Sequence, residues 1–282
     1  EENAWQERAD WLDETEYKRA SRDQLANILK EYNDRIHNSE LAMQHIEQLK
    51  DPRALVMTGG QQAGLFTGPL LVIYKAITII QQAKKAAALL NRAVVPLFWI
   101  AGEDHDFDEV DHIHVAATDG TVHKLQLSRS GGQPRLPVSQ VRISSEEWED
   151  AVEQLENTLM DTEFKHELIE KIRSFAAESD TLTDGFARMM AWLFADYGLV
   201  LLDSADPSLR TLESPMFSWL IEHTDRLNDR FIEGANSVRS LGYHVQAPPR
   251  EGQANLFYVD ADERALLQKE GEQFIDKPGR RF

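Results

Sequence analysis

Six carboxylates fall within nine residues in the segment 102–111, which reads Gly-Glu-Asp-His-Asp-Phe-Asp-Glu-Val-Asp. No lysine or arginine occurs between Ala93 and His123. Carboxylates this close together raise one another's pKa values unless a cation or hydrogen-bond donors intervene. Such a cluster could bind a metal, hold a substrate ammonium group, or supply a general base beside His105. A solvated acidic loop is the alternative interpretation, since it is the usual state of a run of charges.

A glycine-rich segment, residues 59–69, is the second stretch with unusual chemistry and reads Gly-Gly-Gln-Gln-Ala-Gly-Leu-Phe-Thr-Gly-Pro. Glycines let the backbone approach a ligand closely, and the start of a following helix offers free amides to an anion. The Gly-x4-Gly spacing of a phosphate loop is present, but Leu65 and Phe66 replace its lysine and hydroxyl. We interpret the segment as an anion or small-molecule loop, with a tight turn that needs glycine as the alternative.

Two further positions could contribute to a site. Asp203 and Ser204 follow an apolar run, where they either line the rim of a site or cap a helix. Lys75 could face a phosphate, although a lysine on a helix surface is the simpler interpretation. No Gly-x-Ser-x-Gly motif occurs, which weakens a serine hydrolase interpretation.

We assign no residue of the sequence as a metal ligand. His112, His114 and His123 have the residue type of metal ligands, but a surface or partly buried histidine is the more common case. The acidic segment begins like a calcium loop, yet Glu109 stands where that loop requires glycine and Val115 where it requires glutamate.

Three apolar runs lead into these candidate segments, at residues 54–58, 94–100 and 199–202. A helix capped by Thr67, with Pro69 near its first turn, should connect the first run to the second. Strand, helix and strand in this order form a βαβ unit with a right-handed crossover. In open α/β sheets, ligands bind outside the carboxyl ends of the strands, where all three candidate segments would lie. The sequence therefore predicts an α/β fold whose parallel sheet is covered by helices on both faces.

Other signals place the remaining elements. The first 50 residues predict solvated amphipathic helices, and Asp-Gly at 119–120 predicts a small β-hairpin. A capping box at Ser144 and a cap at Thr183 should begin two further helices. We predict a helical segment at 1–50, an α/β core at 51–246 and a β-rich segment at 247–282.

Composition limits the function classes. The chain has 282 residues, is 42% hydrophobic, and carries a formal net charge of -18. That charge repels phosphate backbones and anionic lipid, so we expect neither nucleic acid nor a membrane as partner. No cysteine is present, which excludes disulfides, zinc–thiolate sites and a cysteine nucleophile. The chain begins without methionine and ends at Phe282 in a segment that reads as unfinished, so we expect an internal fragment.

Both candidate loops resemble a known family, the bacillithiol biosynthesis cysteine-adding enzymes (BshC). The resemblance is carried by residues 60–69 with 73–76, and by residues 98–109. It continues at residues 198–203 with Asp206 and Pro207, and at 253–258. It therefore spans nearly the whole chain. The family's proteins are longer, so the resemblance implies that roughly the C-terminal half is missing.

The resemblance implies a cytoplasmic ligase that joins L-cysteine to the amine of glucosaminyl-malate through an amide bond. It implies a Rossmann-like core, and a coiled coil in the missing half that supports a homodimer. The residues themselves fit this chemistry, because the acidic loop could hold the amine as an ammonium group and then remove its proton through Asp104, His105 or Asp106, which we predict as catalytic residues. The glycine–glutamine loop, through Gly60, Gln61, Gln62, Gly64 and Thr67, could cradle malate carboxylates or nucleotide phosphates. Glu103, Asp203 and Ser204 are further predicted substrate- or nucleotide-binding residues.

The cofactor and two rival functions stay open at this point. ATP or another nucleotide could activate the cysteine carboxyl group, but the His-x-Gly-His motif of class I synthetases is absent from the sequence. A metal-dependent hydrolase or nucleotidyl-type transferase would use the acidic segment 103–111 and the nearby histidines as ligands. A small-molecule binding protein with a merely solvated acidic loop is the non-enzymatic alternative.

Overall fold

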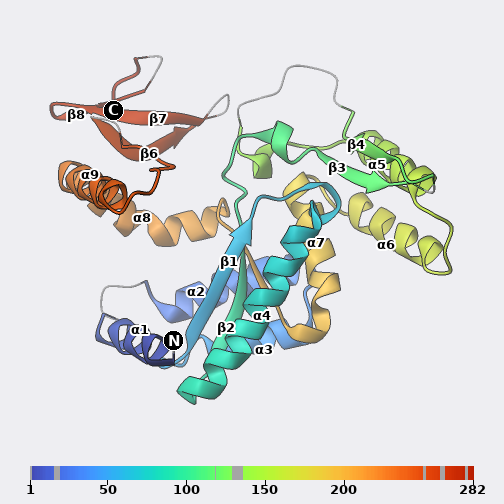
Figure 1. Cartoon of the computed structure of the whole chain (residues 1–282), viewed down its shortest axis with the longest axis horizontal. Helices are drawn as coiled ribbons and strands as arrows, with labels where there is room; N and C mark the ends of the chain where they lie inside the picture. Colours follow the sequence, from blue (N-terminus) through green and yellow to red (C-terminus); the bar gives the residue numbers. More distant parts are fainter. Residues whose placement is uncertain are drawn as a thin grey trace. The chain divides into compact units, whose positions relative to one another are not determined.

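The structure is a computed structural model that describes residues 2–15, 20–117, 119–128, 136–249, 252–260, 264–276 and 279–282. The chain forms two compact units, the first ending at Leu212 and the second consisting mainly of the residues from Glu213 onward. All candidate site residues lie in the first unit. Figure 1 gives the labels of the helices and strands.

A three-stranded parallel sheet forms the centre of the first unit, with the strand order β1-β2-β5. The strands are β1 (Leu55–Gln61), β2 (Val94–Ile100) and β5 (Val200–Asp203), and α4 (Leu70–Leu90) connects the first two. In this register Gln61 and Asp203 both pair with Ile100, so the carboxyl ends of all three strands meet at one edge. This arrangement confirms the predicted Rossmann-like α/β fold.

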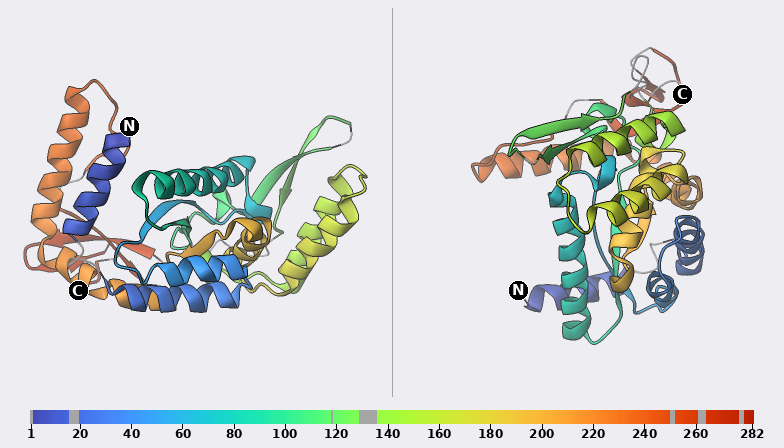
Figure 2. Two further views of the ribbon diagram at one scale, coloured as in Figure 1. Left: turned by 90° about the horizontal axis from the view of Figure 1, so that it is seen from below. Right: turned by 90° about the vertical axis from the view of Figure 1, so that its right-hand side faces the viewer.

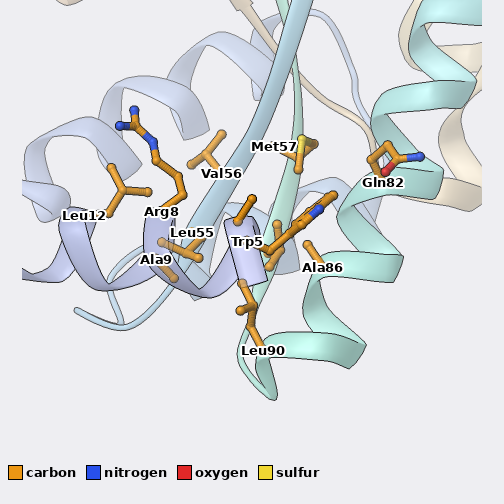
Figure 3. Close-up of a pocket in the computed structure, with 12 residues that line it drawn as sticks. Trp5, Arg8, Ala9, Leu12, Leu55, Val56, Met57, Gln82, Ala86 and Leu90 are labelled. Carbon is orange, nitrogen blue, oxygen red and sulfur yellow. The ribbon is translucent and has the colours of Figure 1, made fainter. Parts of the chain in front are cut away.

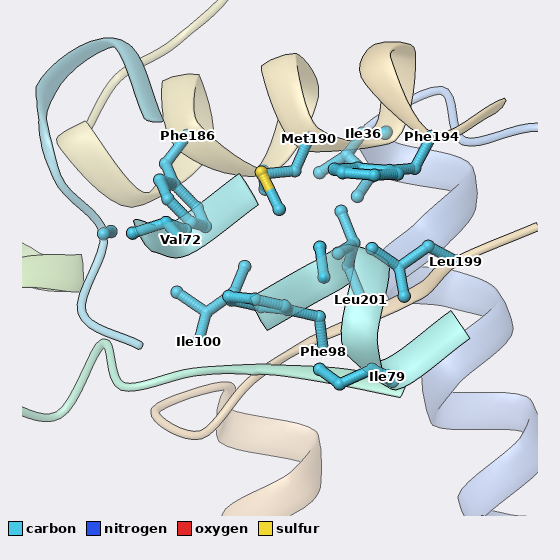
Figure 4. Packing of buried hydrophobic residues seen from close by; sticks show 14 of the residues in the cluster. Ile36, Val72, Ile79, Phe98, Ile100, Phe186, Met190, Phe194, Leu199 and Leu201 are labelled. Atoms are coloured by element: carbon cyan, nitrogen blue, oxygen red, sulfur yellow. The ribbon is translucent and has the colours of Figure 1, made fainter. Parts of the chain in front are cut away.

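Helices cover both faces of the sheet because β2 and β5 are apolar on both faces. On one face, Phe98 and Leu201 pack against α4 and α7 (Leu182–Leu193), as Figure 4 shows. On the other face, Leu97 packs with α2 (Arg22–Arg35) and α3 (Glu40–Gln48), which lie behind the sheet in Figure 1 and are seen from a second direction in Figure 2. Alternate residues of each strand thus belong to two separate cores.

A buried asparagine of α2 hydrogen-bonds the backbone groups at the outer edge of β5. Asn33 has no exposed surface. Its Nδ2 donates to the carbonyl of Leu201 at 2.9 Å, and its Oδ1 accepts the N–H of Leu201 at 3.1 Å. Asn38 donates in the same way to the carbonyl of Leu199 at 2.9 Å. Side-chain amides therefore replace the missing neighbouring strand.

The remaining elements of the first unit surround this core. A hairpin of β3 and β4 packs against α5, and α6 packs between α5 and α7. These elements, with the short 3-10 turns, are α1 (Glu2–Glu14), η2 (Leu65–Thr67), η3 (Phe107–Glu109), β3 (His112–Ala116), β4 (Val122–Gln126), η4 (Val138–Gln140), α5 (Ser145–Thr158), α6 (Lys165–Ala177), η5 (Ala195–Tyr197) and the start of α8 (Pro207–Glu222).

Several local predictions are confirmed. Antiparallel pairing of β3 with β4 confirms the hairpin around 119–120. Ser144 accepts the N–H of Glu147 while the Glu147 carboxylate accepts the N–H of Ser144, which confirms the capping box of α5. The helices predicted within the first 50 residues are present as α1, α2 and α3.

Three local predictions are wrong. Thr67 does not cap α4, because it lies in η2 with a φ of 73° and Pro69 occupies the N-cap position. The cap of α7 is Thr181, whose hydroxyl accepts the N–H of Asp184, and not Thr183. The strand expected at 54–58 is also longer than predicted, since β1 continues through Gly59 and Gly60 to Gln61 and the alternative of a tight turn does not hold at these two glycines.

The second unit contains α9 (Thr224–Ser240) and an antiparallel sheet of β6 (Gln253–Val259), β7 (Arg264–Glu270) and β8 (Gln273–Ile275). Lys269 of β7 bonds to Asp225 of α9 at 2.6 Å. The proposed division into segments 1–50, 51–246 and 247–282 stays a prediction. Within the described ranges, no helix has the length and apolar character that crossing a membrane requires.

Candidate active site

The glycine-rich loop and the acidic loop meet beyond the carboxyl ends of β1 and β2. Gln62 Nε2 donates to Asp104 Oδ2 at 2.6 Å and to Glu109 Oε2 at 2.9 Å. The backbone N–H of Leu65 donates to the carbonyl of Val110 at 2.9 Å. A neutral amide thus lies between two carboxylates, which lowers their mutual repulsion without introducing a positive charge.

Two glycines of the first loop are required by backbone packing. A Cβ on Gly60 would lie 2.0 Å from the carbonyl oxygen of Trp99, so no side chain fits there. A Cβ on Gly64 would lie 2.8 Å from the Cα of Gly68, within the loop itself. The glycine at 60 therefore allows close approach of β1 to β2, and the one at 64 allows the loop to fold back.

A concavity of about 470 Å³ opens where β1 ends. It is lined by residues 58–62 together with Trp99 and Ala101. The predicted site residues Gly60, Gln61 and Gln62 therefore lie together around one concavity. Predicted site residues Gly64 and Thr67 do not line it. The loop after residue 62 instead turns away through η2, which contacts α7.

The predicted catalytic residues of the acidic loop differ in their surroundings. Burial acts to raise the pKa of Asp104, but hydrogen bonds from the Gln62 amide and from the N–H groups of His105 and Asp106 outweigh it. The pKa of Asp104 is therefore lowered, and this carboxylate is charged at neutral pH. His105 and Asp106 are exposed, with His105 Nδ1 at 3.4 Å from Asp104 Oδ1. Buried Phe107 anchors the loop beneath them.

Asp203, at the end of β5, has unusual electrostatics. It is 7% exposed, and this burial raises its pKa to about 7. A hydrogen bond from the N–H of Ala205 at 2.9 Å opposes the shift, while the charges of Glu103 and Asp206 reinforce it. A carboxyl group that titrates near neutral pH can both accept and return a proton.

Buried polar atoms without partners accompany Asp203. Glu103 Oε2 and Ser204 Oγ are buried and have no hydrogen-bond partner. A Cβ on Gly102 would lie 2.2 Å from Asp203 Oδ1, so glycine is required for the loop after β2 to pass this carboxyl group. Buried polar atoms are normally satisfied, and orphaned ones beside a titrating carboxyl group are typical of a functional site.

Asp206, and not Asp203 or Ser204, caps α8. Its Oδ1 accepts the N–H of Ser208 at 2.9 Å, and its Oδ2 accepts from Arg35 at 3.2 Å. This division of roles leaves Asp203 and Ser204 at the rim of the sheet.

The histidines of the hairpin have local partners. His112 Nδ1 lies 2.9 Å from Asp111 Oδ1, and the other oxygen of buried Asp111 accepts from Gln126 at 2.7 Å. The ring of His114 meets that of His112 edge-on, and His123 lies 2.8 Å from the hydroxyl of Thr121. Among the described residues, no group of three or more His, Cys, Asp or Glu side chains is arranged to hold a metal ion.

Lys75 and Trp99 also lie at this edge of the sheet, although the sequence favours a simple surface position for Lys75 and predicts no site role for Trp99. Lys75 Nζ donates to Gln61 Oε1 at 2.5 Å and to the carbonyl of Gly60 at 3.4 Å. Trp99 lines the concavity at the end of β1. Position 75 lies four residues before the buried Ile79, whose side chain would meet a Cβ on Gly59 at 3.1 Å, so helical spacing could have placed Lys75 beside the strand that ends in the glycines.

A separate cavity of about 370 Å³ lies between α1, β1 and α4 (Figure 3). Apolar side chains such as Trp5, Met57 and Leu90 line it, with the charged Arg8. No carboxylate or histidine belongs to this lining, so the cavity lacks the acid–base groups found at the sheet's carboxyl edge.

Relatives of known name are similar to this chain over most of its length. A protein from Geobacillus kaustophilus is 40% identical over 262 residues, which cover 92% of this chain and 48% of that protein. One from Halalkalibacterium halodurans is 37% identical over 271 residues, covering 96% and 49%, and one from Bacillus velezensis is 34% identical over 277 residues, covering 98% and 50%. All three carry the name "Putative cysteine ligase BshC". The chain spans about half the length of these relatives.

The family itself is shown by a match over almost the whole chain. The sequence model described as "Bacillithiol biosynthesis BshC, N-terminal Rossmann-like domain" matches residues 1–281. The parallel sheet with helices on both faces agrees with that description. The chain belongs to the BshC family and corresponds to its N-terminal Rossmann-like domain.

Proposed function

We propose that this chain carries the active site of a ligase that adds L-cysteine to the glucosamine amine of glucosaminyl-malate. The observation that carries the proposal is the meeting of the two family motifs through Gln62 and Asp104, at the sheet edge where Asp203 titrates near pH 7. The names of the relatives support a cysteine ligase over a metal-dependent hydrolase or nucleotidyl-type transferase, which is not favoured.

The two carboxylates suit different parts of the reaction. An amine is an ammonium ion at neutral pH and must lose a proton before it can attack a carbonyl carbon. Asp104, with its lowered pKa, stays charged and can hold the ammonium group. Asp203 has the pKa of a base that accepts the proton as nitrogen bonds to the cysteine carboxyl carbon and the activating group leaves. His105 and Asp106, on the same loop, stay predicted catalytic residues.

The glycine–glutamine loop is the proposed binding surface for the rest of the substrate. Gly60, Gln61 and Gln62 line the concavity at the end of β1, where uncharged donors can meet carboxylate or phosphate oxygens. Glu103 and Ser204 contribute buried oxygens without partners, and Gly64 and Thr67 stay predicted binding residues. ATP or another nucleotide is the proposed activator, although the loop lacks a generic nucleotide motif.

The proposal is tested with the full-length protein, cysteine and glucosaminyl-malate, with and without ATP and magnesium, by mass spectrometry of the product. Asp203→Asn should lower kcat/KM at least about 100-fold, the usual effect of losing a general base. Asp104→Asn should also lower kcat/KM, because it removes the charge that holds the ammonium group. Asp108→Asn, at an exposed position of the same loop, is the matched control and should retain activity. Absence of amide under every condition would refute the ligase.

The family resemblance also leads us to propose a homodimer of the full-length protein in the cytoplasm. Light scattering of the purified full-length protein tests the assembly, and a mass of one protomer at all concentrations would contradict it.

A further inference from the structure

A second concavity, of about 480 Å³, lies between the outer edge of β1 and α4. Thr58 and Gly60 line it from the strand, and Tyr74, Lys75 and Thr78 from the helix. It meets the concavity at the end of β1 along residues 58–60, which line both.

Lys75 is the cation of this concavity, and it is partly buried. Its ammonium group donates to Gln61 Oε1 at 2.5 Å and to the carbonyl of Gly60 at 3.4 Å. Both acceptors are neutral, and within the described residues no carboxylate forms an ion pair with Lys75. A partly desolvated ammonium group without a counter-charge favours the arrival of an anion.

This lysine differs from others in a chain of net charge -18. Lys30, Lys50, Lys165 and Lys269 each pair with a carboxylate, at 2.5 to 2.8 Å. Lys84, Lys85, Lys124 and Lys171 have no ion pair with a described residue either, but they are exposed. The partly buried Lys165 and Lys269 both pair with a carboxylate, so among the described residues Lys75 is the partly buried lysine without one.

The backbone of β1 adds donors to the same place. In a parallel ladder, alternate residues of a strand bond to one neighbour. The N–H of Leu55 donates to the carbonyl of Ala93, and the carbonyl of Gln61 accepts from the N–H of Ala101. The odd-numbered residues of β1 therefore direct their backbone N–H and carbonyl groups toward β2. The even-numbered Thr58 and Gly60 therefore direct their N–H groups to the outer edge, where no described strand pairs with β1.

We infer that Lys75, with the outward N–H groups of Thr58 and Gly60 and the side-chain amide of Gln61, forms a binding site for a carboxylate or phosphate group. Since Gln61 Oε1 faces the ammonium group, its Nε2 is left to donate to a ligand. The ligand's identity rests on the proposed function, which supplies two sources, the malate carboxylates of the amine substrate and the phosphates of an activating nucleotide.

This site and the acidic edge separate opposite charges along one surface. An ammonium group is attracted to Asp104 and repelled by Lys75, and an oxyanion has the opposite preference. A substrate with an amine at one end and carboxylates at the other is thereby oriented with its amine toward the catalytic carboxylates. Lys75 would be a binding and orienting residue, not an acid–base catalyst.

The inference is tested by calorimetric titration of the full-length protein with malate and, separately, with inorganic phosphate. Lys75→Met should weaken binding of the true ligand class at least about tenfold, or 1.4 kcal/mol. Lys75→Arg keeps the charge and should lose less. Lys85→Gln, at an exposed position of the same helix, is the matched control and should bind as wild type. Circular dichroism of each variant checks that the fold is retained.

The two anions distinguish the sources. If only malate binds in a Lys75-dependent manner, the site is a carboxylate site. If only phosphate binds in this manner, it is a phosphate site. Failure of wild type to bind either anion, or equal binding by wild type and Lys75→Met, overturns the inference. If Lys75→Met forms the amide with an unchanged KM for both substrates and nucleotide, the anion site fails while the ligase stands. If an anion binds in a Lys75-dependent manner but the wild-type protein forms no amide, the anion site is supported and the proposed ligase function is refuted.

Discussion

At the scale of single residues, the most informative side chain is Asp203. Its pKa rises from an ordinary 3.8 to about 7 because the carboxyl group is buried at the end of a strand, with Glu103 and Asp206 adding negative charge. Glu103 Oε2 and Ser204 Oγ are buried without partners. Buried groups of this kind cost stability and are typical of functional sites, which is why we place Asp203 in the proposed active site.

The raised pKa of Asp203 predicts a pH-dependent loss of stability. Between about pH 4 and pH 7 the native state holds a proton on Asp203 that the unfolded chain releases, so the free energy of unfolding falls as pH rises through this window. Three pKa units correspond to roughly 4 kcal/mol. Asparagine at position 203 cannot ionise, so Asp203→Asn avoids this cost. At about pH 8 the variant should be more stable than wild type by up to roughly 4 kcal/mol, and near pH 4 the two should be equally stable.

Urea unfolding of both proteins at the two pH values measures the difference. Asp108→Asn, in an exposed position, should follow the wild-type pH dependence and serves as control. An Asp203→Asn variant whose stability relative to wild type is the same at both pH values would show that Asp203 is ionised at little cost.

At the scale of elements, the two outer edges of the parallel sheet differ in how their backbone groups are hydrogen-bonded. The outer edge of β5 is closed by Asn33 of α2, and the outer edge of β1 stays open beside Lys75. One edge thus serves stability, and the other leaves backbone donors for a ligand.

Asn33→Ala should therefore be strongly destabilising. It leaves the buried N–H and carbonyl of Leu201 without partners, and each unsatisfied group costs about 1–3 kcal/mol. A loss of roughly 3 kcal/mol in the free energy of unfolding is expected from denaturant titration. Asn27→Ala, at an exposed position of the same helix, should change stability by less than about 0.5 kcal/mol. Equal effects of the two substitutions would contradict the role of Asn33.

At the scale of the whole molecule, the net charge of -18 acts on every potential partner. It repels polyanions over distances of about a Debye length, roughly 10 Å at 0.1 M salt. A small anion can still reach Lys75 because a short-range contact outweighs a screened field.

The charge predicts that the protein does not bind nucleic acid. Fluorescence anisotropy with a labelled DNA duplex at about 50 mM salt should show no binding at micromolar protein, because no counterions are released from the phosphates. A complex that forms at this salt concentration and weakens steeply toward about 200 mM would contradict the expectation.

Local sequence signals determined much of this protein. Apolar runs predicted the strands, capping residues such as Ser144 predicted helix starts, and two unusual loops identified the family and the edge of the sheet that bears the candidate site. These features depend on residues close together in the chain. The prediction failed for Thr67 and Thr183, where more than one hydroxyl or proline could begin the helix and packing with distant elements decides between them.

Only the tertiary structure decided the electrostatics. The pKa of Asp203 depends on burial and on Glu103, a hundred positions earlier in the chain. The Lys75 ammonium group on α4 is positioned by hydrogen bonds to Gly60 and Gln61 of β1, a contact that forms only in the folded chain. Desolvation and charge interactions act through space, so sequence can name the candidate groups, but the fold determines which of them are buried, paired or left open to a ligand.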